Sequence, residues 1–140
     1  MSRTAIVATI VTSILAFSSP SIAASDEELG HLGELVSAAF KCSTYAAESN
    51  DPKEEERLFQ IGLKAARDFV EGMKNQMKYE EYRGGVSTDF VVGMMYKEQS
   101  DKADDEIRKY HREKPLVAGS DEAKNEAKLR YRDSNCYLIQ

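Results

Sequence analysis

Residues 51–77 read DPKEEERLFQIGLKAARDFVEGMKNQM, and this stretch carries the clearest helical pattern of the chain. It begins with Asp51 as a good N-cap, Pro52 at the first helical position and Glu54 at capping-box spacing. Apolar or small residues then recur every three or four positions in two adjacent rows, Leu58, Gly62, Ala65, Phe69, Met73 and Phe59, Leu63, Ala66, Val70, Met77. The pattern predicts a helix over residues 52–77. Because the two rows form a wide apolar stripe, we expect this helix to touch two neighbours and to be the central one.

Two further helices are indicated by their N-terminal signals. Ser25 and Glu28 have capping-box spacing and lead into an apolar repeat, which predicts a helix over residues 26–48. Near the C-terminus, Ser120 or the residue after it can cap a helix over residues 122–134, whose apolar face is weak. No strand-like alternation extends over more than a few residues. The sequence therefore predicts an all-α fold, a single small bundle of about four helices.

The remaining helix of this bundle is expected to begin after Ser87 or Thr88 and to end before Pro115. Its first turns, residues 90–96, are apolar on every side, which predicts burial all round. Gly93 costs about 1 kcal/mol relative to alanine inside a helix, so its presence suggests a close approach by another backbone. Small residues of the preceding helix would let the two helices meet there, namely Gly62 and Ala66.

The N-terminus has the composition of a secretory signal peptide over residues 1–23, which leaves residues 24–140 as the mature α-helical domain. Arg3 supplies the positive charge, residues 5–17 form the apolar region, and residues 21–23 (Ser-Ile-Ala) provide the small residues of a cleavage site. The apolar region is shorter than the roughly 20 residues that cross a bilayer. We expect an exported protein, periplasmic or secreted, without a stable membrane span after cleavage. An uncleaved N-terminal anchor is the alternative.

The chain has two cysteines, Cys42 and Cys136, and both lie in the mature region. Export leads to an oxidising compartment, and two cysteines have only one intramolecular pairing, so a Cys42–Cys136 disulfide is predicted. It would tie the first helix to the C-terminal tail and close a loop of nearly the whole domain. Such a loop stabilises by roughly 4–5 kcal/mol in the chain-entropy model. Two buried free thiols are the alternative.

Composition excludes several classes of function. The chain has 140 residues with 19 Lys and Arg against 24 Asp and Glu, a net charge of −5, which argues against nucleic-acid binding through a basic surface. With only two histidines, a histidine-rich metal site is not expected. There is no glycine-rich phosphate loop, and we expect no cofactor and no metal.

No catalytic residue is predicted either. His31 and His111 are expected to have structural or surface roles. His31 and Cys42 lie too far apart along one helix to form a nucleophile and base pair, and His111 could meet Cys42 only through the fold. The acidic run at residues 54–56 falls in the first turn of a helix, where negative charge is favoured. The acidic residues between 101 and 106 alternate with basic ones, as on a solvated face. A hydrolase would need distant carboxylates to meet in the fold.

The connector before the third helix is the candidate partner-binding surface. It carries tyrosine and arginine, which are enriched in binding hot spots, ahead of a glycine turn. The residues concerned are Tyr79, Tyr82, Arg83, Gly84 and Gly85. A second candidate is a small apolar pocket between the helices of residues 52–77 and 88–114, lined by Phe69, Met73, Met94 and Met95.

These observations favour a non-enzymatic protein-binding module. A small, acidic, disulfide-closed and exported helical domain fits an inhibitor, an immunity-type protein or an accessory protein that acts on another exported protein. The alternative is a carrier of a small apolar ligand, which would use the pocket between the second and third helices.

Overall fold

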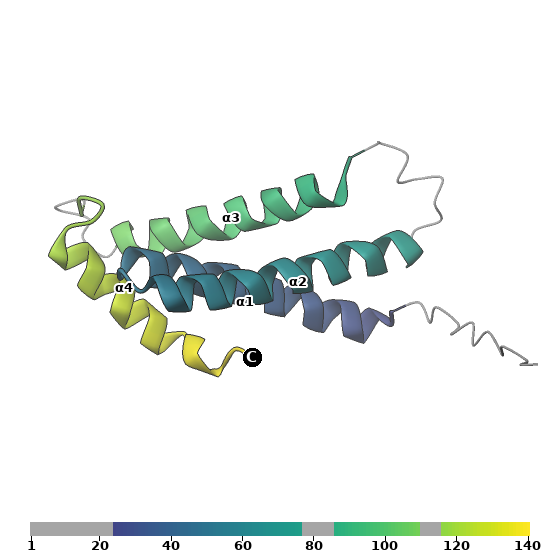
Figure 1. The fold of residues 1–140 in the computed structure, drawn as a ribbon, viewed down its shortest axis with the longest axis horizontal. Helices are drawn as coiled ribbons and strands as arrows, with labels where there is room; N and C mark the ends of the chain where they lie inside the picture. Colours follow the sequence, from purple (N-terminus) through teal and green to yellow (C-terminus); the bar gives the residue numbers. More distant parts are fainter. Residues whose placement is uncertain (1–23, 77–85, 110–115) are drawn as a thin grey trace, which may run out of the picture.

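The computed structural model describes residues 24–76, 86–109 and 116–140 (Figure 1). Within these ranges it contains four α-helices and a final 3₁₀ turn, which are α1 (Asp26–Glu48), α2 (Pro52–Gln76), α3 (Thr88–Lys109), α4 (Asp121–Asp133) and η1 (Cys136–Leu138). The predicted all-α bundle is confirmed. The predicted helix limits agree to within one residue wherever they are described, and the predicted ends at Met77 and at residues 110–114 lie outside the described residues. None of the described helices is long and apolar enough to cross a membrane.

Side chains cap the helices largely as predicted. The Ser25 hydroxyl accepts from the Glu28 backbone N–H at 3.2 Å, and the Glu28 carboxylate accepts from the Ser25 N–H at 3.4 Å, a complete capping box. At α2, Asp51 accepts from the Glu54 N–H at 3.2 Å. The reciprocal half predicted there is wrong, because the Asp51 N–H donates to the Ala46 carbonyl at 2.9 Å. The other two helices are capped by Ser87 and Ser120.

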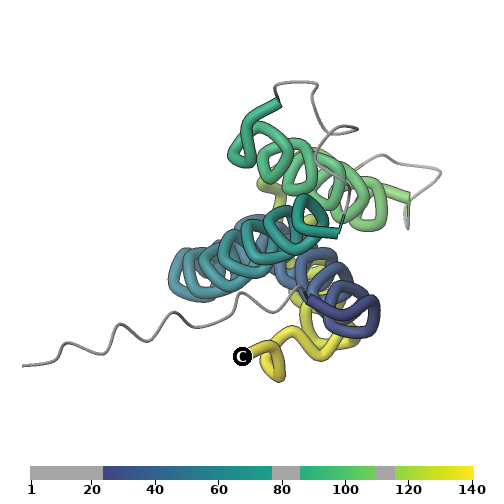
Figure 2. The backbone as a smooth tube through the Cα atoms, turned by 90° about the vertical axis from the view of Figure 1, so that its right-hand side faces the viewer, coloured from purple at the N-terminus to yellow at the C-terminus, as the bar shows by residue number. Residues whose placement is uncertain are grey.

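The central helix is α1, which corrects the prediction that α2 takes this place. α1 packs against α2, α3, α4 and η1, whereas α2 packs closely on α1 and α3. Both views place α3 on one side of the α1–α2 pair and the C-terminal part of α4 on the other (Figures 1 and 2). The reason lies in α1 itself, where residues 42–46 are all buried, polar Ser43 and Thr44 included. A helix that is buried all round needs neighbours on every side.

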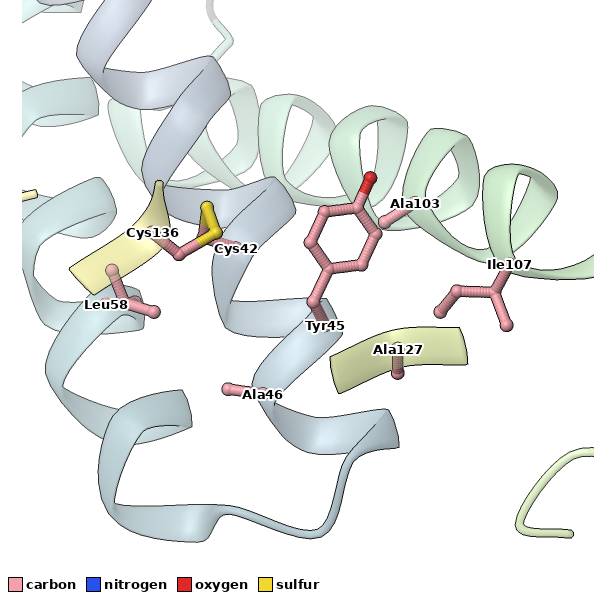
Figure 3. Close-up of a cluster of buried hydrophobic side chains, with 8 residues drawn as sticks. All are labelled: Cys42, Tyr45, Ala46, Leu58, Ala103, Ile107, Ala127 and Cys136. Atoms are coloured by element: carbon pink, nitrogen blue, oxygen red, sulfur yellow. A yellow bond between two sulfur atoms is a disulfide. The ribbon is translucent and has the colours of Figure 1, made fainter. Parts of the chain in front are cut away.

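Two groups of buried side chains form the interior. The disulfide core lies where α1, the start of α2, α3, α4 and η1 meet, and Figure 3 shows its members, Cys42, Tyr45, Ala46, Leu58, Ala103, Ile107, Ala127 and Cys136. The hairpin core fills the space between α1, α2 and the first half of α3, and consists of Val36, Phe40, Ala65, Ala66, Val70 and Val92. The two cores therefore divide the bundle along its length, with α1 common to both.

The predicted disulfide is confirmed. Cys42 and Cys136 are joined with their Cα atoms 5.6 Å apart, and 94 positions separate them in sequence. A second tie holds the same tail, because Arg57 donates from Nη1 to the Ile139 carbonyl at 2.5 Å and from Nη2 towards the Cys136 carbonyl at 3.5 Å. The C-terminal segment is thus fixed to α1 by a covalent bond and to α2 by an arginine.

The first turns of α3 are not buried all round, contrary to the prediction. Val92 is buried, but Phe90 and Met94 are each 59% exposed. α3 lies on one side of the α1–α2 pair, so among the described residues the first turns of α3 pack against these helices on one side (Figure 2). The sequence also predicted a close approach of α2 and α3 at Gly62 and Gly93, and this is wrong. A Cβ atom at Gly62 would lie 2.6 Å from Phe40 Cδ1, so the close approach is between α2 and α1.

Candidate functional site

The residues predicted for binding fall into two groups. Tyr79, Tyr82, Arg83, Gly84 and Gly85 lie outside the described residues, so their role as a partner surface stays a prediction. The four residues of the alternative ligand pocket do not come together. Phe69 and Met95 pack against the hairpin core, Met94 is exposed, and Met73 is half-buried.

A pocket does lie between α2 and α3, but a different set of side chains lines it. Its volume is about 200 Å³, and it is lined by Phe40 of α1, by Phe59, Leu63 and Arg67 of α2, and by Asp89, Val92, Gly93 and Tyr96 of α3. Phe40 is fully buried at its base. Most of these side chains are apolar, and the charged pair Arg67 and Asp89 is exposed at the edge.

Two contacts between the helices set the limits of this pocket. The Phe59 and Tyr96 rings meet edge to face with their centroids 5.2 Å apart. Eight residues along α2, Arg67 Nη2 binds Asp89 Oδ1 at 3.1 Å. The helices run antiparallel, so the level between these two contacts is that of Leu63 on α2 and Gly93 on α3. Because glycine has no side chain to meet Leu63, the groove stays hollow at this level.

Gly93 therefore has a different role from the predicted one. A Cβ atom built at this position would meet nothing within 4 Å, so no neighbouring backbone or side chain requires a glycine here. A glycine within a helix costs about 1 kcal/mol relative to alanine. Packing does not account for that cost, and Gly93 lines the pocket, so a large side chain at this position would project from the pocket wall.

An exposed apolar strip lies beside the pocket on α3. We call it the α3 strip, and it consists of Val86, Phe90 and Met94, with exposed fractions of 43%, 59% and 59%. Phe90 and Met94 are four residues apart and lie on one side of the helix. Each directly follows a pocket residue in sequence, Asp89 and Gly93, so strip and pocket occupy neighbouring rows of α3. Together they form a surface with a hollow and adjoining apolar projections.

Two other hollows are polar. One, of about 360 Å³, lies at the α1–α2 turn against α4 and is lined by Ser49, Asn50, Asp51, Lys128 and Tyr131. The other, of about 560 Å³, is lined by charged side chains of α3 alone, and pairs four residues apart neutralise several of them, such as Lys97 with Asp101 and Lys102 with Glu98. Neither combines a hollow with exposed apolar side chains as the α2–α3 surface does.

The strongest electrostatic interactions join the helices and lie away from the pocket. Glu106 of α3 accepts from Lys41 Nζ at 2.6 Å and from the Tyr45 hydroxyl at 2.5 Å, both on α1. Burial and the neighbouring Glu106 carboxylate raise the pKa of Tyr45 well above its ordinary value. Burial alone would raise the pKa of Glu106, but the hydrogen bonds from Lys41 and Tyr45 outweigh it and lower that pKa. This cluster holds α3 onto α1.

A second cluster holds α4 onto α2. The Glu54 carboxylate accepts from Arg57 Nη2 at 2.8 Å and from the Tyr131 hydroxyl at 2.5 Å. These hydrogen bonds, with that of Arg57 the larger, lower the pKa of Glu54 to about 2. The acidic run at residues 54–56 thus includes a structural carboxylate, which agrees with the structural role assigned to it.

The described residues offer little for catalysis or metal binding. Among them, no group of three or more His, Cys, Asp or Glu side chains could hold a metal ion. Both cysteines are in the disulfide. His31 is exposed on α1, and His111 lies outside the described residues. Within the same ranges the buried acid is Glu126, and its carboxylate accepts from Arg130 Nε at 2.8 Å.

Comparisons of the chain with protein-family models, with curated proteins and with solved structures found no match. The function is therefore argued from the geometry of the α2–α3 surface.

Proposed function

We propose that the protein is a non-enzymatic protein-binding module, of the inhibitor, immunity or accessory kind, that binds another exported protein through the α2–α3 surface. One observation carries this proposal. An apolar pocket, lined in part by Gly93 inside a helix, lies beside the exposed Phe90 and Met94. Exposed aromatic and methionine side chains next to a desolvated hollow are typical of the centre of protein interfaces.

Export is part of the proposal. The signal-like residues 1–23 and the Cys42–Cys136 disulfide support it, because disulfides persist in oxidising compartments outside the cytosol. The connector with Tyr82 and Arg83 precedes Val86 in the sequence, and its role in partner binding stays a prediction.

The size of the pocket favours a protein partner over a small-ligand carrier. Sites for drug-sized ligands have volumes of about 300–1,000 Å³ and enclose most of the ligand. At about 200 Å³ the pocket is smaller and lies at the surface between two helices. It has room for one side chain of a partner, while the α3 strip would contact the surface around that side chain.

The test is affinity capture from an exported-protein extract of the native host, with four oxidised baits compared in parallel. Wild type and the control Leu129→Asp keep the surface intact, since Leu129 is a 43% exposed apolar residue on α4. Phe90→Asp places a charge in the α3 strip, and Gly93→Leu fills the pocket. All four baits must have the same helical circular-dichroism spectrum.

We expect one stoichiometric partner that the first two baits retain and the last two lose. Loss of the partner's enzymatic activity on binding would identify an inhibitor, and unchanged activity would identify an accessory protein. A partner retained equally by all four baits would refute the α2–α3 surface. If no protein is captured, the small-ligand carrier becomes the better hypothesis.

A further inference from the structure

The pocket between α2 and α3 matches one six-membered ring in size. A buried cavity of about 150 Å³ in a protein is enough to hold a benzene molecule. The pocket measures about 200 Å³ and is open at the surface, so a ring can enter from outside while its attachment to a polypeptide remains in solvent. The dimensions therefore fit the side chain of an aromatic residue.

The walls have the chemistry that favours a ring over an aliphatic chain. Phe40, Phe59 and Tyr96 form a continuous aromatic wall, with the Phe40 and Phe59 centroids each 5.2 Å from that of Tyr96 in edge-to-face contacts. Aromatic rings gain energy beyond area burial when they meet in such tilted arrangements. A guest ring at the level of Leu63 and Gly93 would extend this aromatic cluster.

Charged side chains at the edge of the pocket restrict the kind of aromatic ring that fits it. The guanidinium of Arg67 is about half exposed and lines the pocket, so it can lie over the electron-rich face of a guest ring. The same guanidinium disfavours a cationic guest. Arg67 donates to Asp89 Oδ1 through both Nε and Nη2, which leaves Oδ2 as an acceptor on a side chain that is 76% exposed. An acceptor next to a ring-sized hollow complements a ring that carries a hydrogen-bond donor.

We infer that the pocket receives a tyrosine or tryptophan side chain of the partner protein. The ring would lie between Leu63 and Gly93 against the aromatic wall, and its phenol O–H or indole N–H would donate to Asp89. That the ring belongs to a protein rests on the proposed function. The charge complementarity of Arg67 with the ring face and of Asp89 with the donor is independent of it.

The experiment is a titration of the ¹⁵N-labelled, oxidised protein with amino-acid amides, followed by backbone amide shifts. The probes are the N-acetyl amides of tyrosine, tryptophan, phenylalanine and leucine. We expect saturable shifts at Gly93 and Leu63 with the three aromatic probes, and no shift at Ala127 in the disulfide core. Tyrosine and tryptophan should bind about three- to tenfold more tightly than phenylalanine, the net effect of one ordinary hydrogen bond, because Asp89 is largely exposed to solvent.

Three variants separate the contributions of the open pocket and of Asp89 to binding of the probes. Gly93→Leu should abolish the shifts at Leu63 with every probe. Asp89→Asn should remove the preference for tyrosine over phenylalanine, and the control Asp101→Asn, a change elsewhere on α3, should keep it. Absence of saturable shifts with all aromatic probes, or leucine binding as tightly as tyrosine, overturns the inference. Equal binding of phenylalanine and tyrosine to wild type overturns the role of Asp89.

The outcomes also distinguish this inference from the proposed function. If tyrosine and tryptophan amides bind but no partner is captured, the pocket chemistry holds and the protein-binding function fails. If a partner is captured through the α2–α3 surface and the probes show no aromatic preference, the function holds and the aromatic anchor fails. Self-association of the wild type that Gly93→Leu abolishes would assign the ring to a second copy of this chain, whose Tyr137 is 58% exposed, and would overturn the separate partner.

Discussion

Two glycines in the middle of helices should respond to the same substitution with opposite signs. Replacing glycine by alanine in a helix interior stabilises by about 0.8–1.0 kcal/mol when the new methyl group has room. At Gly93 a Cβ meets nothing within 4 Å, so the whole gain should be realised. We expect Gly93→Ala to raise the free energy of unfolding by about 1 kcal/mol, which raises the melting temperature by about 4 °C in a domain of this size.

Gly62→Ala gains the same stability from helical propensity, but overpacking against Phe40 offsets this gain. The new Cβ would lie 2.6 and 2.7 Å from Cδ1 and Cε1 of Phe40. Phe40 is fully buried, and its ring packs against Phe59 and Tyr96, so moving the ring away from Gly62 would disturb both ring contacts. Overpacking of a core costs about 1–3 kcal/mol. The net effect of Gly62→Ala should therefore lie between about zero and a loss of 2 kcal/mol.

The informative quantity is the difference between the two variants, because helical propensity cancels in it. We expect Gly93→Ala to be more stable than Gly62→Ala by about 1–3 kcal/mol. Urea unfolding followed by circular dichroism at 222 nm measures it, provided that the slope with denaturant is the same in both variants. Equal stabilities would refute the close approach of α2 to Phe40. A destabilised Gly93→Ala would refute the open pocket at that position.

The other predictions concern the ties between helices and the pH dependence of stability. Cys42→Ser should lower the free energy of unfolding by up to about 4–5 kcal/mol, the chain-entropy value for a loop near 100 residues; equal melting temperatures with and without reductant would contradict this. Arg57→Met removes the hydrogen bonds to the tail, and faster hydrogen exchange confined to residues 136–139 and to their neighbours on α2 is expected. The pKa of Glu54 is lowered from 4.5 to about 2 by folding, so its contribution to stability is complete above about pH 4.5 and is lost as the pH falls towards 2. Glu54→Gln should therefore lose less stability between pH 7 and pH 3 than wild type in urea unfolding, and an identical loss would argue against the Arg57 and Tyr131 contacts as its cause.

The parts of the fold that the sequence predicts correctly depend on local chemistry. The Ser25–Glu28 capping box and the Asp51-Pro52 start mark the beginnings of α1 and α2 because side chains within three residues satisfy the first N–H groups of a helix. The disulfide was predictable because two cysteines in an oxidising compartment allow one pairing. None of these conclusions needs the position of another helix.

The predictions that were wrong concern contacts between helices. The central position of α1 buries Ser43 and Thr44. Polar residues of this kind do not indicate a buried face in a sequence, so this position was not predicted. Phe90 and Met94 suggested burial by their character, yet each is 59% exposed. The pocket combines residues of three helices. Gly93 lies level with Leu63 because of the way α3 is positioned along α2. Gly93 itself was a sequence signal for the pocket, because a glycine inside a helix lowers stability and no local feature explains its presence here.

The disulfide also imposes an order on the making of this protein. Cys136 is synthesised 94 positions after Cys42, and after all the residues of α1, α2, α3 and α4. Until then Cys42 has no partner in its own chain, although it belongs at the centre of the disulfide core. The hairpin core contains no cysteine and draws on α1, α2 and α3 alone, so its side-chain contacts do not require the disulfide. A chain interrupted before η1 would therefore carry Cys42 as an unpaired thiol.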